Sequence, residues 1–439
     1  MNARELALNV VCKVFNEDAY SNIVLNKELN NKDIKEVDRG LITEIVYGTI
    51  KYKYTIDYII RVFVKDIRKV DNYILNILRI TIYQMRYLDK VPNYAAVNEA
   101  VNLAKRKSQG ASKFVNGVLR NYIRNKDKDF LNKDNKFERW SYEYSFEPWM
   151  VKFLHKQYGD RYTELILKGL NSRPEVTVRV NLSKYSYDEV FSNLEESGYE
   201  IYQGFICKEA IRISKGSNIE KNKSFIEGKI TVQDESAMLV APSMKLQTGD
   251  VVLDLCSAPG GKTTHIGEIL EGSGQVFAFD IHENKLSLIR QNTNRLSLTN
   301  ISCDTMDATK LNEDFIDKAD KVLIDVPCSG LGIIRKKPEI KWNKSLKNLK
   351  DIVEIQRNIM DNASKYVKKG GVLLYSTCTL NKEENEENVK WFLNNHSDFK
   401  LEKVFFGDAN NIIYSEEGYA TILPQENMDG FFIARLIKV

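Results

Sequence analysis

The sequence lacks the features of a disulfide-linked, zinc-binding or membrane-spanning chain. Its 439 residues include six cysteines and four histidines, and no two cysteines have CxxC spacing. Neither a disulfide framework nor a recognisable zinc-ligand spacing is present, so we expect no metal. No apolar run approaches the roughly 18 residues of a membrane span, and polar residues interrupt the N-terminal segment before a signal-peptide core forms. We therefore expect a cytoplasmic protein with no membrane partner.

Two common nucleotide-binding motifs are also missing. A Walker A loop needs a glycine five positions before Gly261, where this chain has Cys256. No GxGxxG fingerprint follows a predicted strand either. ATP binding through a P-loop and dinucleotide binding through the usual fingerprint are therefore disfavoured.

The composition fits folded domains with an uneven charge. Hydrophobic residues make up 43% and charged residues 28% of the chain, which excludes a disordered or collagenous protein and allows two to four domains. The formal net charge is +4, yet residues 1–140 hold 26 Lys and Arg against 17 Asp and Glu. This basic first third fits a polyanion partner, although a solvated helix face also produces such a charge run.

The hydrophobic pattern divides the chain into three parts. Residues 1–140 have apolar side chains three and four apart, as in Ile42, Ile45, Val46 and Ile50, which predicts a helical bundle. Residues 141–230 combine predicted helices and strands in a small α+β module that either binds RNA or connects domains.

Residues 231–439 alternate between predicted strands and helices. This alternation predicts an α/β domain of the Rossmann-like type, built on an open and mostly parallel sheet. The predicted strands include 251–253, 276–279, 322–324 and 372–375, with a last candidate at 430–438.

A glycine-containing loop follows the first strand of this α/β domain. Paired glycines let the backbone approach a ligand closely, and the free N–H groups of the next helix face whatever binds there. Tight strand-to-helix turns use glycine as well, so the pair alone is weak support for a ligand. The loop residues are Cys256, Ser257, Ala258, Pro259, Gly260, Gly261 and Lys262.

Acidic residues stand at the ends of the next predicted strands. Asp280 lies where such folds hold a ribose diol, and Asp307 is placed to reach an adenine edge. Each carboxylate alone is more often a helix cap or turn residue. Together with the loop they predict an adenosine ligand without phosphates, because only Lys262 is available to a polyphosphate.

Two cysteines follow the fourth and fifth predicted strands. Cys328 lies in the segment Asp325 to Gly330, and Cys378 lies in the segment Tyr375 to Thr379. The carboxyl ends of adjacent strands in such a sheet share one crevice, so both thiols are expected to face the cofactor. A lone cysteine there is usually a small buried hydrophobe, but a pair makes that interpretation weaker.

These motifs resemble those of RNA cytosine-5 methyltransferases that use S-adenosylmethionine. The matching runs are DLCSAPGGKT (254–263), DVPCSG (325–330), STCT (376–379) and DGFF (429–432), with Ser257 and Thr379 in place of the Ala and Ser usual in the family. Residues 91–101 and 114–120 resemble a NusB-type helical domain. The combination is similar to the bacterial 16S ribosomal RNA methyltransferases of the Sun/Fmu type.

The resemblance implies an architecture and a set of roles. It implies a NusB-like RNA-binding domain over 1–140, a middle module over 141–230 and a methyltransferase domain over 231–439. S-adenosylmethionine would be the cofactor, S-adenosylhomocysteine its product, and naked or partly assembled small-subunit ribosomal RNA the substrate of a monomeric enzyme. Cys378 would be the nucleophile and Cys328 would assist product release. Asp325 would hold the cytosine edge and contact the cofactor, with the 256–262 loop, Asp280 and Asp307.

Two other interpretations stay open from the residues alone. The same fold could methylate another RNA, a small molecule or a protein, with the cysteines as packing residues. Alternatively, the chain could be a non-catalytic RNA-binding factor whose helical domain carries the function. Such a factor would have no need of carboxylates at successive strand ends.

Overall fold

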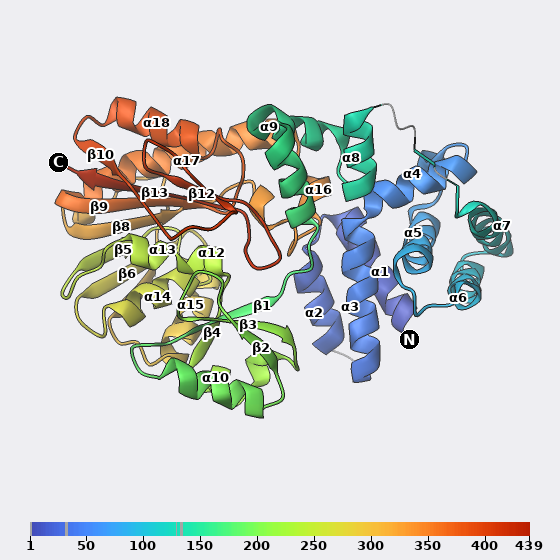
Figure 1. Ribbon diagram of the computed structural model, residues 1–439, viewed down its shortest axis with the longest axis horizontal. Coiled ribbons are helices and arrows are strands. Elements are labelled where there is room, and N and C mark those ends of the chain that lie inside the picture. The colour runs from blue at the N-terminus through green and yellow to red at the C-terminus, as the bar shows by residue number, and fades with distance from the viewer. Residues whose placement is uncertain (1, 31–33, 129, 132–134) are drawn as a thin grey trace. The chain divides into compact units, whose positions relative to one another are not determined.

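A computed structural model describes residues 2–30, 34–128, 130–131 and 135–439 (Figure 1). The chain divides into two compact units. The first comprises residues 1–171 together with 334–344, and the second comprises residues 172–333 together with 345–439. The boundaries that the sequence places at 140 and 230 remain predictions.

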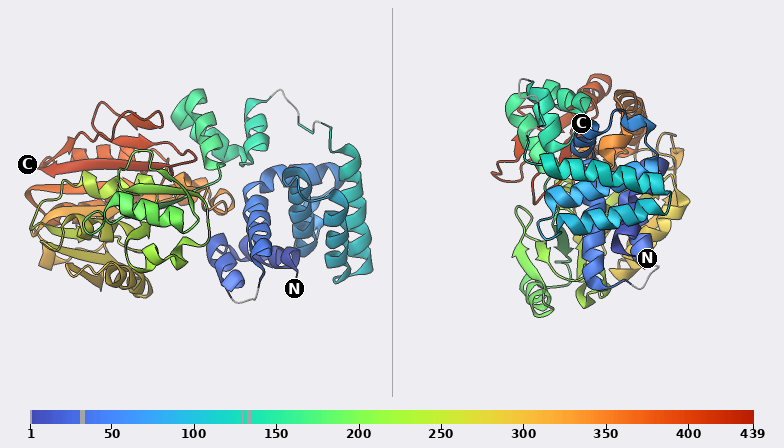
Figure 2. Two further views of the ribbon diagram at one scale, coloured as in Figure 1. Left: turned by 60° about the horizontal axis from the view of Figure 1, so that its bottom comes forward. Right: turned by 90° about the vertical axis from the view of Figure 1, so that its right-hand side faces the viewer.

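The first unit is helical, as its apolar periodicity predicts. α5 lies at its centre, because every residue from Ile74 to Gln84 is buried. Its neighbours α6 and α7 pack side by side (Figure 2). The helices are α1 (Ala3–Glu17), α2 (Ser21–Asn30), α3 (Glu36–Lys51), α4 (Lys53–Phe63), η1 (Ile67–Lys69), α5 (Asn72–Tyr87), α6 (Asn93–Lys105), α7 (Gln109–Asn125), α8 (Lys136–Tyr144), α9 (Pro148–Leu170) and α16 (Ile340–Asn343).

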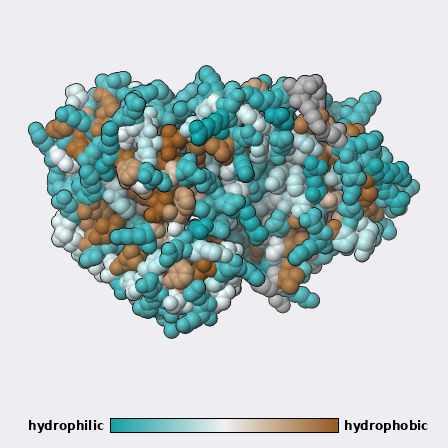
Figure 3. All heavy atoms as spheres, viewed as in Figure 1, coloured by the Kyte–Doolittle hydropathy of each residue, from teal (hydrophilic) through white to brown (hydrophobic). Residues whose placement is uncertain are grey.

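The basic segment of this unit lies on its surface. The lysines and arginines between residues 105 and 126, on α6, α7 and the turn that joins them, are exposed, and Figure 3 shows mainly hydrophilic side chains over these helices. They are Lys105, Arg106, Lys107, Lys113, Arg120, Arg124 and Lys126.

Residues 334–344 belong to the helical unit although they come from the middle of the second unit's sequence. Lys341 is fully buried, and its Nζ lies within hydrogen-bond distance of three backbone carbonyls and of Asn171 Oδ1. Trp342 Nε1 donates to the carbonyl of Ile50 at 2.8 Å. Burial lowers the pKa of Lys341 well below its usual value, with a further contribution from Lys51.

The second unit begins with a four-stranded antiparallel sheet in the order β2-β3-β1-β4. One face of this sheet packs on α10 through alternating apolar residues such as Val178, Val180 and Ile211. Its elements are β1 (Val176–Val180), α10 (Tyr187–Glu196), β2 (Glu200–Gln203), β3 (Ala210–Lys215), η2 (Ile219–Lys221), α11 (Lys223–Ile226) and β4 (Ile230–Val232).

A larger sheet follows in the order β11-β12-β13-β9-β8-β5-β6-β7, with β10 paired to β13. The pairs from β9 to β7 are parallel, as the sequence predicts, and β10 to β13 extend them with antiparallel strands. The elements are α12 (Glu235–Met238), α13 (Val240–Ser243), β5 (Val251–Asp254), α14 (Gly261–Ile269), β6 (Gln275–Asp280), α15 (Glu283–Arg295), β7 (Ile301–Thr305), η3 (Glu313–Phe315), β8 (Ala319–Asp325), η4 (Leu331–Ile333), α17 (Leu346–Tyr366), β9 (Val367–Thr377), α18 (Glu386–Asn395), β10 (Phe399–Glu402), β11 (Ile412–Tyr414), β12 (Ala420–Ile422) and β13 (Phe431–Lys438).

Both faces of this sheet are buried, which explains the apolar runs Val322–Ile324 of β8 and Val372–Tyr375 of β9. Successive residues of β8 enter different cores: Val322 and Ile324 pack with α17 and α18, whereas Leu323 packs with α13 and α14. The strand order reverses between β5 and β8, the position where such sheets open a crevice at their carboxyl ends. In the described part of the chain, no helix is both long and apolar enough to cross a membrane.

Candidate active site

The cofactor loop runs from the end of β5 into α14. Gly260 has φ of +102°, and a Cβ there would lie 3.3 Å from the Cα of Ile289, so the turn requires glycine. Ser257 donates from its backbone N–H and its hydroxyl to Phe279 O, which ties the loop to β6. The first turn of α14, whose N–H groups have no acceptor within the helix, therefore lies just after the carboxyl end of β5.

Asp254 is buried beneath this loop. Thr263 donates to its Oδ2 at 2.7 Å, whereas Oδ1 is buried and has no hydrogen-bond partner among the described residues. Burial raises the pKa of Asp254 to about 7. An unused acceptor under a loop with free N–H groups fits a ligand that carries a donor, such as an amino acid or a nucleoside.

Asp280 and Asp307 lie at the predicted strand ends. Asp280 ends β6 and accepts from the N–H of Ala258 at 3.3 Å and of His282 at 2.9 Å. Asp307 follows β7 and accepts from the hydroxyl and the N–H of Thr309. The hydrogen bond from the Thr309 hydroxyl is the main reason why the pKa of Asp307 is lowered. Each carboxylate therefore also serves its local turn, which leaves part of its acceptor capacity for a ligand.

Asp325 and Lys262 form an ion pair at the crevice. The Nζ of Lys262 lies 2.6 Å from Asp325 Oδ2, and Ser376 donates to Asp325 Oδ1 at 2.8 Å. Burial opposes the charged form of Lys262, but the Asp325 charge outweighs it and raises the pKa of Lys262. The ammonium also interacts electrostatically with Cys378 and lies 5.2 Å from the ring centre of Phe431.

The two predicted thiols meet at this edge. Cys328 Sγ and Cys378 Sγ are 3.2 Å apart, close enough for an S–H···S hydrogen bond, and both residues are partly exposed. The contact with Cys378, followed by burial, raises the pKa of Cys328 well above its usual value. Cys328 is therefore expected to keep its proton next to Cys378.

Two buried charged groups near the site have no motif in the sequence. Glu384 is fully buried and accepts from Ser329 next to Cys328. Arg179 of β1 forms a bidentate ion pair with Glu268 of α14 and donates to the carbonyl of Gly261. Both depend on contacts between distant segments, so hydrophobic periodicity carries no signal for them.

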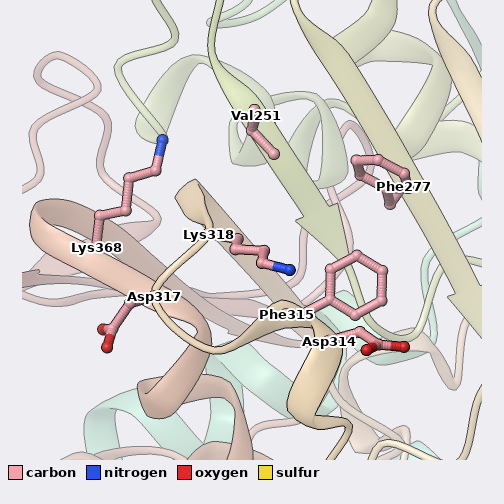
Figure 4. A pocket seen from close by; sticks show the side chains of 7 residues that line it. All are labelled: Val251, Phe277, Asp314, Phe315, Asp317, Lys318 and Lys368. Carbon is pink, nitrogen blue, oxygen red and sulfur yellow. The ribbon is translucent and has the colours of Figure 1, made fainter.

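A separate hollow of about 470 Å³ lies at the other end of the strands. It is formed where β5 and β9 begin and by the segment before β8, so it does not include the thiols (Figure 4). Its lining residues are Val251, Phe277, Asp314, Phe315, Asp317, Lys318 and Lys368.

Comparison with known proteins gives the same three parts in the same order. Residues 1–124 match the NusB family, residues 146–220 match a ferredoxin-like domain of RsmF/B-like methyltransferases, and residues 241–437 match the 16S rRNA methyltransferases RsmB/F.

Full-length relatives are found among curated proteins. The chain is 37% identical to the probable ribosomal RNA small subunit methyltransferase B of Bacillus subtilis, over 100% of this chain and 99% of the relative. It is 30% identical to ribosomal RNA small subunit methyltransferase B of Shewanella oneidensis, again over 100% of this chain and 99% of the relative.

Two solved structures are also similar. PH0851 matches with a TM-score of 0.84 and 27% identity over 100% of this chain and 99% of its own. NSun6 from Pyrococcus horikoshii, solved with SFG, matches with a TM-score of 0.59 and 25% identity over 66% of this chain and 97% of its own. The full-length identity, the domain order and the loop at the sheet edge together show that the chain belongs to the RsmB family of 16S rRNA methyltransferases with an N-terminal NusB domain.

Proposed function

We propose that this protein methylates C5 of a cytosine in small-subunit ribosomal RNA through a covalent bond between Cys378 Sγ and cytosine C6. The observation that carries the proposal is the pair of partly exposed sulfurs 3.2 Å apart at the crevice, beside the Lys262–Asp325 ion pair. A thiolate is the nucleophilic form of cysteine, and the Lys262 ammonium is the positive charge that interacts with the Cys378 side chain.

The chemistry explains the need for a nucleophile. Cytosine C5 is too poor in electrons to take a methyl group directly. Attack of the Cys378 sulfur on C6 moves the C5=C6 electron pair onto C5, which becomes the attacking carbon. Bound S-adenosylmethionine supplies an electrophilic methyl group. C5 then gives its proton to a water molecule, the electron pair of that C–H bond forms the C5=C6 bond again, and the electron pair of the C6–S bond returns to Cys378.

Other residues hold the substrate and the cofactor. Asp325 is held by Ser376 and Lys262 and would accept from the cytosine N3/N4 edge, which favours protonation at N3 as sulfur adds. Residues 256–262 would hold the methionine part of S-adenosylmethionine, Asp280 would hold the ribose and Asp307 the adenine edge. The free Oδ1 of Asp254 and the first N–H groups of α14 support this placement.

Replacing the cysteines one at a time tests the assignment. We expect Cys378→Ala to give no covalent protein–RNA complex on a denaturing gel, and Cys328→Ala to accumulate it. Cys303→Ala, a partly buried cysteine on β7, serves as the matched control and should behave as wild type. A complex formed by the Cys378→Ala variant but not by the Cys328→Ala variant would reverse the two roles.

The same protein samples distinguish the other interpretations. Bisulfite sequencing of 16S rRNA, naked or partly assembled, should show a methylated cytosine that the Cys378→Ala variant does not produce. Methyl transfer to a protein or small molecule without RNA would favour an enzyme that uses the same fold on a substrate other than ribosomal RNA. A chain that does not bind S-adenosylmethionine in calorimetry would instead be a non-catalytic RNA-binding factor.

The exposed basic helices give the substrate RNA a place to bind. An extruded base requires the strand to be held on either side, and Lys113, Arg120 and Arg124 are exposed on α7. Changing all three to Gln should weaken RNA binding and reduce the slope of log affinity against log salt by roughly 2 to 3. Unchanged affinity and slope would mean that these charges only solvate the helix.

A further inference from the structure

A buried carboxylate lies between the two thiol loops. Glu384, in the connection between β9 and α18, is 0% exposed. Its oxygens accept from Ser329 N at 2.9 Å, Ser329 Oγ at 2.5 Å, Gln356 Nε2 at 3.0 Å and Asn381 Nδ2 at 3.0 Å. These four donors are all neutral. Because the side chain is removed from water, these hydrogen bonds stabilise the carboxylate, and losing any of them would be costly.

The carboxylate fixes both chain neighbours of Cys328. Ser329 follows Cys328 and donates to Glu384 twice. Gln356 Nε2 donates to Glu384 and also to the carbonyl of Pro327, the preceding residue, at 3.0 Å. The thiol of Cys328 is therefore carried by a segment that Glu384 holds at both ends.

The same carboxylate reaches the loop of Cys378. The Ser329 hydroxyl gives its only proton to Glu384, so the 2.6 Å contact between Ser329 Oγ and Thr379 Oγ1 has Thr379 as donor. Thr379 follows Cys378, and Asn381 lies two residues further on. Glu384 thus links the side chains of the two loops, in addition to the backbone hydrogen bonds Gly332 N–H to Cys378 O and Val326 N–H to Ser376 O.

The charged groups near the sulfur of Cys328 differ from those near the sulfur of Cys378. The hydrogen bond with Cys378 and burial raise the pKa of Cys328, and the nearby side chains of Glu384 and Asp325 disfavour a negative charge on its sulfur as well. Cys378 is the sulfur coupled to the Lys262 ammonium. Cys328 is therefore the sulfur of the pair that keeps its proton.

We propose that Glu384 is a positioning residue that holds the two thiol loops together and keeps the Cys328 thiol protonated beside Cys378 Sγ. This inference rests on the proposed function and deepens it. The nucleophile of the proposed function is the Cys378 thiolate, whose proton passes to solvent, and the S–H group of Cys328 donates a hydrogen bond to it before it attacks C6. When the C6–S bond later breaks, Cys378 recovers the electron pair as a thiolate, and the same S–H group stabilises it as leaving group.

The proton position is tested on the protein without RNA. Wild-type protein is treated briefly with iodoacetamide at pH 7, and labelling of Cys378 and Cys328 is compared by mass spectrometry. Glu384→Gln should lower the ratio of Cys378 to Cys328 labelling about tenfold, the equivalent of one pKa unit. Glu386→Gln removes a buried carboxyl two residues away and should keep the wild-type ratio. An unchanged ratio in folded Glu384→Gln would overturn the proposal.

The spacing is tested with a second variant that keeps the charge. Ser329→Ala removes the hydroxyl link between Glu384 and Thr379, so the covalent RNA complex should accumulate several-fold while the labelling ratio stays near wild type. If Glu384→Gln does not fold, release of RNA at the wild-type rate in Ser329→Ala would refute the proposal. The labelling experiment uses no RNA, whereas the cysteine variants are tested by their covalent RNA complex. Failure of the role of Glu384 and failure of the covalent mechanism can therefore be told apart.

Discussion

The ion pair of Arg179 and Glu268 connects the four-stranded sheet to the helix of the cofactor loop. Their side chains are 0% and 5% exposed, with Nε–Oε2 at 2.9 Å and Nη2–Oε1 at 2.8 Å. Arg179 also donates to the carbonyl of Gly261 at 3.0 Å and to Thr264 Oγ1 at 3.3 Å. One arginine thereby fixes both the start and the middle of α14.

Replacing Arg179 by Met should be strongly destabilising. Removing one partner leaves the Glu268 carboxylate buried without its counter-charge, which costs about 3 to 5 kcal/mol of unfolding free energy. The double variant Arg179→Met, Glu268→Met removes both charges and should recover most of that loss. In both variants Gly261 loses its anchor, so we expect S-adenosylmethionine binding to weaken about tenfold, roughly 1.4 kcal/mol.

Denaturant unfolding and calorimetry measure the two effects. Arg212→Met on β3 is the matched control, because its ion pair with Glu175 is partly exposed at 21% and 28% and should contribute less than about 1 kcal/mol. If Arg179→Met were no more destabilising than Arg212→Met, the buried pair would not connect the sheet to α14. A double variant as unstable as the single one would contradict the desolvation argument.

Two further predictions concern buried ionisable groups. Asp254→Asn should be more stable than wild type at pH 8, and this advantage should fall by about 2 kcal/mol at pH 5.5. The reason is that the pKa of Asp254 is raised to about 7 in the folded protein, so its protonated carboxyl stabilises wild type in acid and this stabilisation is lost as the pH rises through 7. If denaturant melts gave the same stability difference between variant and wild type at both pH values, this reasoning would be contradicted. Lys341→Met leaves buried carbonyls and Asn171 without a donor, so we expect a loss of about 2 to 4 kcal/mol in thermal or denaturant unfolding. Lys156→Met, at an exposed position of α9, should change little. Equal effects of the two substitutions would show that the buried amino group of Lys341 contributes no net stability.

Local patterns in the sequence predicted the parts of the site that local geometry specifies. The glycine turn before α14, the carboxylates at the ends of β6 and β8 and the two cysteines after β8 and β9 lie where the motifs place them. The parallel order of β9 to β7 brings these strand ends to one edge, as the alternation of strands and helices predicts. The roles of Cys378, Cys328 and Asp325 stay predictions for the cysteine and RNA experiments.

Long-range polar contacts were not predictable in the same way. Ser329 and Glu384 are 55 residues apart, and Arg179 and Glu268 are 89 apart. A charged residue at such a position is indistinguishable in the sequence from one on the surface, because periodicity reports which face is apolar and not which polar groups meet inside. Residues 334–344 likewise give no sign that they fold with the helical unit.

The sequence by itself determined the kinds of element, their order and the chemical groups at the strand ends, because backbone preferences, hydrophobic alternation and motif spacing act over short stretches of chain. Only the tertiary structure decided that the two sulfurs lie 3.2 Å apart, that Glu384 is buried between their loops, and that Arg179 anchors the cofactor helix. Burial removes these polar groups from water, so their energies depend on partners that only the folded chain brings together.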